Sequence, residues 1–353
     1  MPETVTEIPK ALFDATVQMQ IRTGRYASKT VRDIIGLLNQ ADADILRKIS
    51  ATDAPFTKAR LQALLKEIRT VYKEIYSEAG SELKQQMIDF AGVRADQTAA
   101  LIATQLPVNY NIIQATAEQL KAIVDVAPVT VGPDKKLLLE EIFTSLANGK
   151  EEAIRGAIRL GMVQGESTPE LVRRIKGTKA AQYKDGLLEI HRRHAESIVR
   201  TVTNHTSNMA MQQTYKNNSK VVKNWIFTAT LDGKTSLTCA SLSGTVWPVG
   251  KGPIPPRHVR CRSISAPEIA TFRELGFNID ELPPGMRASK DGLVRSDISF
   301  QDWLKGQDKT TQVDILGKTR AELFRSGKVT IDRFTDDMGR VLTLEQLKIA
   351  KQG

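Results

Sequence analysis

The side chains best suited to chemistry gather in one stretch, residues 225–268. It contains both cysteines of the chain, Cys239 and Cys261, together with His258. Thiolate sulfur and imidazole nitrogen are donors that zinc takes in proteins. The His-x-x-Cys spacing lets two of these side chains reach one ion, and the loop after Cys239 is long enough to return to them. The stretch therefore predicts a candidate zinc site formed by Cys239, His258 and Cys261.

A structural zinc site takes four ligands, and these residues supply three. Asp232 or His205 could supply the fourth, and the spacing favours neither. In the alternative interpretation without metal, the cysteines are small buried apolar residues, free or disulfide-linked, and the histidine is a hydrogen-bonding strut. His191 and His194 lie three apart among arginines on a predicted helix. We expect them on a solvated or partner-facing stripe rather than at a metal.

The sequence around these residues does not favour catalysis. A Cys–His nucleophile pair needs an orienting acid or amide, which Asp232 or Asn224 could provide, but no nucleophile signature surrounds Cys239. A metal-dependent nuclease centred on His258 would need carboxylate or further histidine ligands, and residues 244–267 contain no acid. We therefore expect no enzyme, with a nuclease or toxin-like module as the alternative.

The same acid-free segment is basic. It carries Lys251, Arg257, Arg260 and Arg262, and the whole chain has a formal net charge of +10. Basic side chains attract phosphates and release their counterions. These four residues therefore predict a basic patch that contacts the phosphates of nucleic acid. In the alternative, the arginines bond backbone carbonyls or pair with acids of a partner protein.

Helical patterns precede this stretch. Apolar residues at helical spacing predict helices over 10–50 and 56–105, separated by a break at Pro55 because proline disfavours helix in the residue before it. The helix over 56–105 needs a partner to bury its apolar stripe, either the first helix or another chain. Self-association through this helix is therefore one expectation. Asn148-Gly149 predicts a turn between two short helices, over 134–147 and 150–160.

The pattern changes to strands near residue 221. β-branched and aromatic residues predict a strand over 221–230, and prolines limit the strands after it to short ones. The fold class is thus α+β and mainly α-helical. We expect three domains: a helical, coiled-coil-like domain over 1–130, a helix with a small irregular β unit over 131–268, and a small α+β tail over 269–353.

Two further properties bear on where the protein works. No run of about 18 apolar residues occurs, so we expect no transmembrane helix and no membrane partner. The N-terminal residues lack a secretory pattern, and two cysteines fit a reducing compartment.

An ordered series of motifs spans residues 135–265. It comprises Arg200-Thr201, Asn204, Trp225, Thr230-Leu231-Asp232, Thr235, Cys239, Leu242-x-Gly244, Pro255-Pro256, His258 and Cys261-Arg262. In this series the chain resembles the phage head morphogenesis family, the Mu F-like minor head proteins. The family's last motif reads Pro-Pro-x-His-x-x-Cys-Arg-Cys, and its final cysteine is Ser263 here. A metal site that used that thiolate would lose one ligand.

The resemblance implies a Mu F-like head morphogenesis domain over 131–268. It further implies a structural virion protein of a tailed bacteriophage, made in the host cytoplasm and placed inside the capsid near the portal. The implied partners are the portal protein, the capsid interior and the packaged double-stranded DNA, which is bound without sequence preference and whose packaging or exit such proteins influence. The tail also resembles tails that carry toxin or nuclease modules in some members, but it shows no constellation for either activity.

Overall fold

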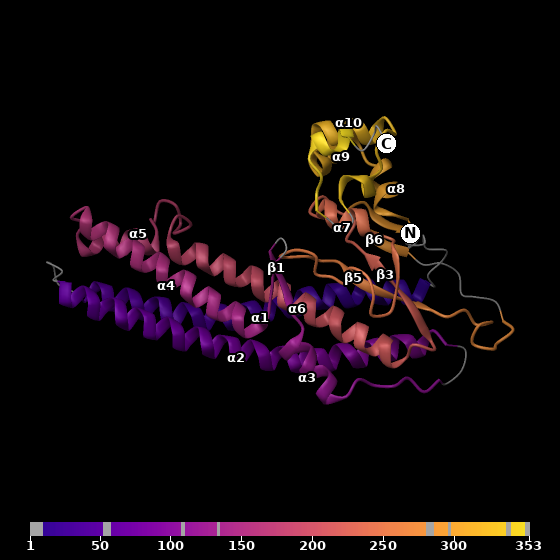
Figure 1. Ribbon diagram of the computed structural model, residues 1–353, viewed down its shortest axis with the longest axis horizontal. Coiled ribbons are helices and arrows are strands. Elements are labelled where there is room, and N and C mark those ends of the chain that lie inside the picture. The colour runs from indigo at the N-terminus through magenta and orange to yellow at the C-terminus, as the bar shows by residue number, and fades with distance from the viewer. Residues whose placement is uncertain are drawn as a thin grey trace. The chain divides into compact units, whose positions relative to one another are not determined.

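The computed structural model describes residues 10–51, 58–106, 110–132, 135–279, 286–295, 298–336 and 340–349. The predicted break at Pro55 lies outside the described residues. The helices are α1 (Lys10–Ser50), α2 (Lys58–Thr104), α3 (Ala117–Val126), α4 (Leu139–Val163), α5 (Thr168–Lys176), α6 (Leu187–Asn217), α7 (Leu237–Leu242), α8 (Phe300–Lys305), α9 (Lys309–Leu316), α10 (Lys318–Arg325) and α11 (Leu344–Ile349), with the 3-10 helix η1 (Ile331–Phe334) (Figure 1). The strands are β1 (Val129–Gly132), β2 (Lys135–Leu137), β3 (Val222–Thr228), β4 (Val246–Pro248), β5 (Ile264–Ile269), β6 (Met286–Ser289) and β7 (Gly292–Arg295).

Long helices and small antiparallel sheets confirm the predicted α+β, mainly helical class. In the described part of the chain, no helix combines the length and the apolarity that a membrane span requires. The fold divides into two compact units. The first comprises residues 1–24, 90–120 and 204–353, and the second comprises residues 25–89 and 121–203. The division into domains 1–130, 131–268 and 269–353 stays a prediction.

The second unit is built on the apolar stripes of its helices. Ile34 and Ile45 of α1, Ile68 and Leu83 of α2, and Ile154 of α4 are fully buried in one core. Burial of such a stripe is what stabilises a long helix in water. In this unit the stripe of α2 is therefore covered by helices of the same chain, while self-association through residues 56–105 stays a prediction.

The predicted turn at Asn148-Gly149 is wrong, because α4 continues through both residues. The neighbouring side chains Ala147 and Lys150 are buried, and a glycine inside a helix costs only about 1 kcal/mol relative to alanine. Packing on both sides of the dipeptide outweighs that cost. Residues 135–137 also differ from the expected helix, since they form β2, which pairs antiparallel with β1.

The first unit contains the three-stranded sheet, with strand order β4-β3-β5 and antiparallel pairing throughout. The predicted strand over 221–230 is confirmed as the central strand β3, in which Trp225 lies opposite Trp247 of β4 and Pro267 of β5. Met211 and Tyr215 of α6 join the sheet in one core. This core carries the stretch in which the sequence gathers its cysteines and histidine.

The C-terminal helices of the first unit form a further core around Phe300, Trp303 and Phe334. Leu231 and Ala240 of the loop and helix after β3 are part of it. The segment that leads from β3 into α7 is therefore packed against the tail.

Candidate metal centre

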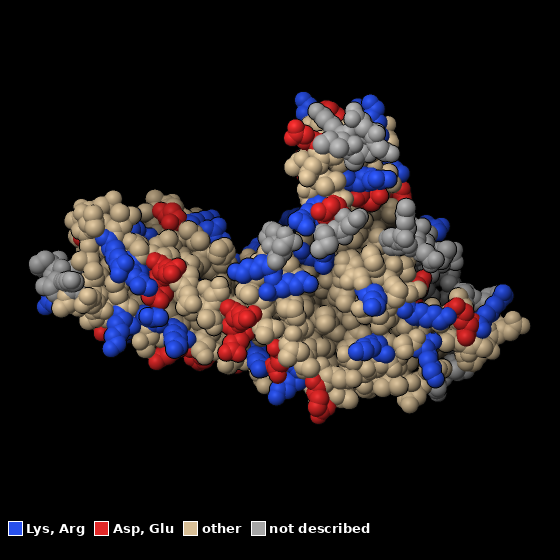
Figure 2. Space-filling view, in the orientation of Figure 1, with Lys and Arg blue, Asp and Glu red and all other residues tan. Residues whose placement is uncertain are grey.

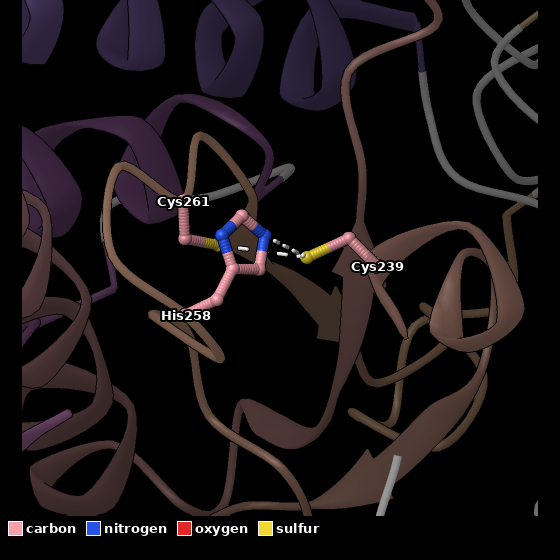
Figure 3. Close-up of side chains that lie close together, drawn as sticks. All are labelled: Cys239, His258 and Cys261. Atoms are coloured by element: carbon pink, nitrogen blue, oxygen red, sulfur yellow. Dashed lines mark hydrogen bonds between the residues drawn. The ribbon is translucent and has the colours of Figure 1, made fainter. Parts of the chain in front are cut away.

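The three donors predicted from the sequence converge in the first unit. The Sγ atom of Cys239 lies 3.3 Å from Nε2 of His258 and 3.6 Å from Sγ of Cys261. Their ligand atoms all lie within 4.8 Å of one another. Both cysteines are buried and the histidine is half-buried. Figure 3 shows the three side chains pointing toward one another, with Cys239 on one side and His258 and Cys261 on the other.

Cys239 is positioned by the start of α7. Ser236 is the N-cap residue of this helix, and its Oγ accepts a hydrogen bond from the Cys239 backbone N at 3.2 Å. The preceding turn is fixed by Asp232, whose Oδ1 accepts from the backbone N of Lys234 at 2.9 Å. Capping of this kind orients the first turn of a helix. The sulfur of Cys239 is thus held where α7 begins.

His258 and Cys261 are brought together by a tight turn. The backbone N of Cys261 donates to the carbonyl of His258 at 3.1 Å, and Arg260 between them has φ +61°. Residues with a Cβ adopt this left-handed region rarely, and such residues cluster at functional sites. Nδ1 of His258 lies 2.9 Å from the carbonyl oxygen of Val259. Because a carbonyl only accepts, Nδ1 carries a proton, and Nε2 is the ring nitrogen that faces the cysteines.

Two asparagines of α6 fix the backbone where the chain enters β5. Nδ2 of Asn204 donates to the carbonyls of Cys261 and Ser263, at 2.9 and 3.2 Å. Oδ1 of Asn208 accepts from the backbone N of Ser265 at 2.8 Å. Both asparagines are buried, so these amides satisfy backbone groups that water cannot reach. Asn208 was not predicted as a site residue, although it lies four residues after Asn204 and therefore on the same face of the helix.

Ser263 occupies the place of the family's last cysteine. It is buried, and its hydroxyl hydrogen-bonds to the sulfur of Cys239. The position therefore belongs to the cluster even though its side chain is not a thiol.

The three groups shift one another's protonation. The hydrogen bond from Cys239 and the interaction with His258 hold the pKa of the Cys261 thiol well below its usual range. The pKa of the Cys239 thiol is raised well above its usual range, first by its hydrogen bond to Cys261 and then by burial. Burial alone would lower the pKa of His258, but the Cys261 sulfur outweighs it and raises that pKa. The lowered pKa favours the thiolate form of Cys261, which is the form that ligates metals.

Neither predicted candidate for a fourth ligand joins this group. Both carboxylate oxygens of Asp232 accept hydrogen bonds from Arg262, at 2.6 and 2.7 Å. His205 is buried on α6. Among the described residues, the ligand atoms gathered at this place come from Cys239, His258 and Cys261 alone.

A small pocket opens on the cluster. Its volume is about 10 Å³, which is close to the space of one water molecule. It is lined by Thr230, Lys234, Thr235, Ser236, Cys239, His258, Arg260, Arg262 and Ser263. Cys239 and His258 therefore border a water-sized space with a cationic rim.

The four basic residues predicted to contact DNA differ in their surroundings. Lys251 and Arg260 are exposed, whereas Arg257 is half-buried and Arg262 is paired with Asp232. On the face drawn in Figure 2, basic and acidic side chains are interspersed. The DNA contact stays a prediction.

Residues 152–265 match the sequence profile of a family described as "Phage Mu protein F like protein". A comparison with curated proteins and one with solved structures found no significant match. The matched range contains α6, β3 and all three members of the cluster. The resemblance drawn from the ordered motifs is confirmed. Residues 152–265 thus form a Mu F-like segment of the phage head morphogenesis family.

Proposed function

We propose that the chain is a structural minor head protein of a tailed bacteriophage, working inside the capsid near the portal. The family match over residues 152–265 is the observation that carries this proposal. The surroundings of the cluster support a structural role, because Asn204 and Ser236 bond backbone groups of the segments that carry the cysteines. Asp232, the acid nearest in sequence to Cys239, is engaged by Arg262.

The decisive experiment locates the protein in purified particles. A protein inside the capsid should remain with DNA-filled heads, resist protease in intact particles and become sensitive once the heads are opened. Cross-linking followed by mass spectrometry should join it to the portal protein. Absence from particles, or digestion while the heads are intact, would contradict the internal location.

We further propose that the chain binds double-stranded DNA without sequence preference. The formal charge of +10 supports this, and Lys251 and Arg260 are the most exposed members of the predicted set. Each phosphate contact contributes about 0.9 to the slope of log affinity against log salt. The double variant Lys251→Gln/Arg260→Gln should therefore reduce that slope by about 2.

The matched control for this test removes two exposed charges from α2, as Lys66→Gln/Lys73→Gln. It changes the net charge equally and should leave the slope nearly unchanged. Equal effects of the two double variants would show that net charge alone drives binding. Cleavage of plasmid or RNA by the purified chain, abolished in His258→Ala, would instead favour a metal-dependent nuclease.

A further inference from the structure

We propose that Cys239, His258 and Cys261 bind one zinc ion whose fourth coordination position faces the pocket beside Ser263. This proposal does not depend on the location in the virion or on DNA binding. It rests on the distances between the donors, on the groups that orient them and on the space next to them.

The distances fit three corners of a tetrahedron. Zinc lies about 2.3 Å from a thiolate sulfur and about 2.0–2.1 Å from an imidazole nitrogen. Tetrahedral angles then place two sulfurs roughly 3.8 Å apart, and a sulfur roughly 3.6 Å from a nitrogen. The structure has 3.6 Å between the sulfurs and 3.3 Å between Cys239 Sγ and His258 Nε2. These two distances lie within a few tenths of an ångström of the expected ones, and the third pair, Cys261 and His258, lies within 4.8 Å. A disulfide would instead need sulfurs about 2.05 Å apart.

The donors are also oriented before any ion binds. The proton on Nδ1 of His258 is held by the Val259 carbonyl, which leaves Nε2 for the metal. Nδ2 of Asn204 donates a hydrogen bond to the backbone carbonyl of Cys261 and so fixes this part of the backbone. Hydrogen bonds of this kind to ligand residues raise metal affinity, since they remove the cost of ordering the ligands during binding.

No side chain of the described residues supplies the fourth ligand of the ion, so a small molecule occupies that coordination position. The hydroxyl of Ser263 lies at the sulfur of Cys239, and zinc sites in proteins use thiolate, imidazole or carboxylate rather than an alcohol. The carboxylate of Asp232 is engaged by Arg262. The pocket of about 10 Å³ accommodates one water. The ion would join the start of α7 to the turn over residues 258–261, so we assign it a structural role.

The first test measures metal content and thermal stability of the full chain under reducing conditions. The protein should contain about one zinc per chain after purification without chelator. Zinc returned to the chelated protein at a hundredfold excess over its Kd should raise the Tm by about 3–4 °C. Magnesium should have no such effect, because sulfur and imidazole donors disfavour hard cations.

The second test adds a ligand rather than removing one, so a failure to fold does not obscure it. With cobalt(II) in place of zinc, the native chain should show tetrahedral bands and charge-transfer absorption from two thiolates. Ser263→Cys should increase that absorption about 1.5-fold, since three thiolates then replace two. Ser326→Cys, an exposed serine in the tail, is the control and should leave the spectrum unchanged.

Three results would overturn the proposal. A chain without zinc whose Tm ignores added zinc would leave only a hydrogen-bonded thiol cluster. A mass about two daltons below that of the reduced chain after purification without reductant, with no metal, would indicate a disulfide instead. A spectrum of Ser263→Cys identical to that of Ser326→Cys would refute the assignment of the fourth position.

Discussion

Each compact unit buries a cluster of polar side chains, and the two clusters are built in opposite ways. In the second unit Lys150 Nζ lies 2.5 Å from Asp42 Oδ1, and the hydroxyl of Tyr72 donates to the same oxygen at 3.3 Å. The rings of Tyr72 and Tyr76 face the ammonium at 5.0 and 5.9 Å. Burial raises the pKa of Asp42 and lowers that of Lys150. The positive charge of Lys150 thus compensates the negative charge of Asp42 within the cluster.

The cluster in the first unit is incomplete by comparison. Cys239, His258 and Cys261 provide three donors that converge on one point, and the pocket takes the place of a fourth. In a complete cluster the buried groups satisfy one another, and loss of one partner leaves an uncompensated buried charge. An incomplete cluster contributes according to what binds to it. The difference predicts that the two units respond differently to substitution, to metal and to pH.

The largest effect should come from breaking the complete cluster. Lys150→Met leaves the carboxylate of Asp42 buried without its partner, which costs about 3–5 kcal/mol of unfolding free energy. Denaturant unfolding measures this cost. Adding Asp42→Asn should recover most of the loss, and Lys48→Met, which removes an exposed pair with Glu67, should change stability little. A cost for Lys150→Met as small as that of Lys48→Met would show that the pair is not a buried charge pair.

A smaller effect should come from the groups that hold the incomplete cluster. Asn204→Ala removes the amide donor from the buried Cys261 carbonyl and one of the two amide donors from the Ser263 carbonyl, and it should cost about 1–3 kcal/mol. It should also weaken zinc binding roughly 10–100-fold, since the Cys261 backbone is no longer fixed. Asn208→Ala, which loses its bonds to Ser265 and its longer ones to Asn204 Oδ1 and the Ser263 carbonyl, should cost stability but reduce zinc affinity less than Asn204→Ala does. Equal loss of zinc in both variants would refute a specific positioning role for Asn204.

The smallest effect concerns pH in the second unit. Burial lowers the pKa of His191 to about 4, with Lys150 and His194 adding positive charge nearby. The unfolded chain takes up the proton near the ordinary value of 6.5, so stability is lost as pH falls from about 6.5 to 4. Because the ring is partly exposed, we expect a loss of only about 1 kcal/mol. His191→Gln should remove this loss from unfolding curves, whereas substitution of the exposed His194 should retain most of it.

The sequence predicted most of the fold through periodicity. Apolar spacing located α1 and α2, and β-branched residues located β3. It failed at α4, because Asn148-Gly149 has the local preferences of a turn. The buried pair between Lys150 and Asp42 connects residues far apart in the sequence, and no local pattern reveals such a contact.

The site was predicted in part from rare residue types rather than from periodicity. Cysteine and histidine are so scarce in this chain that Cys239, His258 and Cys261 could be singled out by type and spacing. Their supports could not be found by type and spacing: Asn204 was singled out only by the family motif and Asn208 not at all, because both act on backbone carbonyls and amides that any sequence provides. The pairing of Arg262 with Asp232 likewise depends on the turn that brings them together.

The way α1, α2 and α6 each contribute to both compact units has a consequence for gene exchange. Three of the four boundaries between the units fall inside these helices, and the fourth falls inside the short helix α3. A recombination event that replaced residues 152–265 would import α6 whole, with Val199 for one core and Tyr215 for the other. The incoming helix would have to suit two resident cores at once. Viable hybrids should therefore arise mainly between parents whose α1 and α2 have diverged little at those two cores.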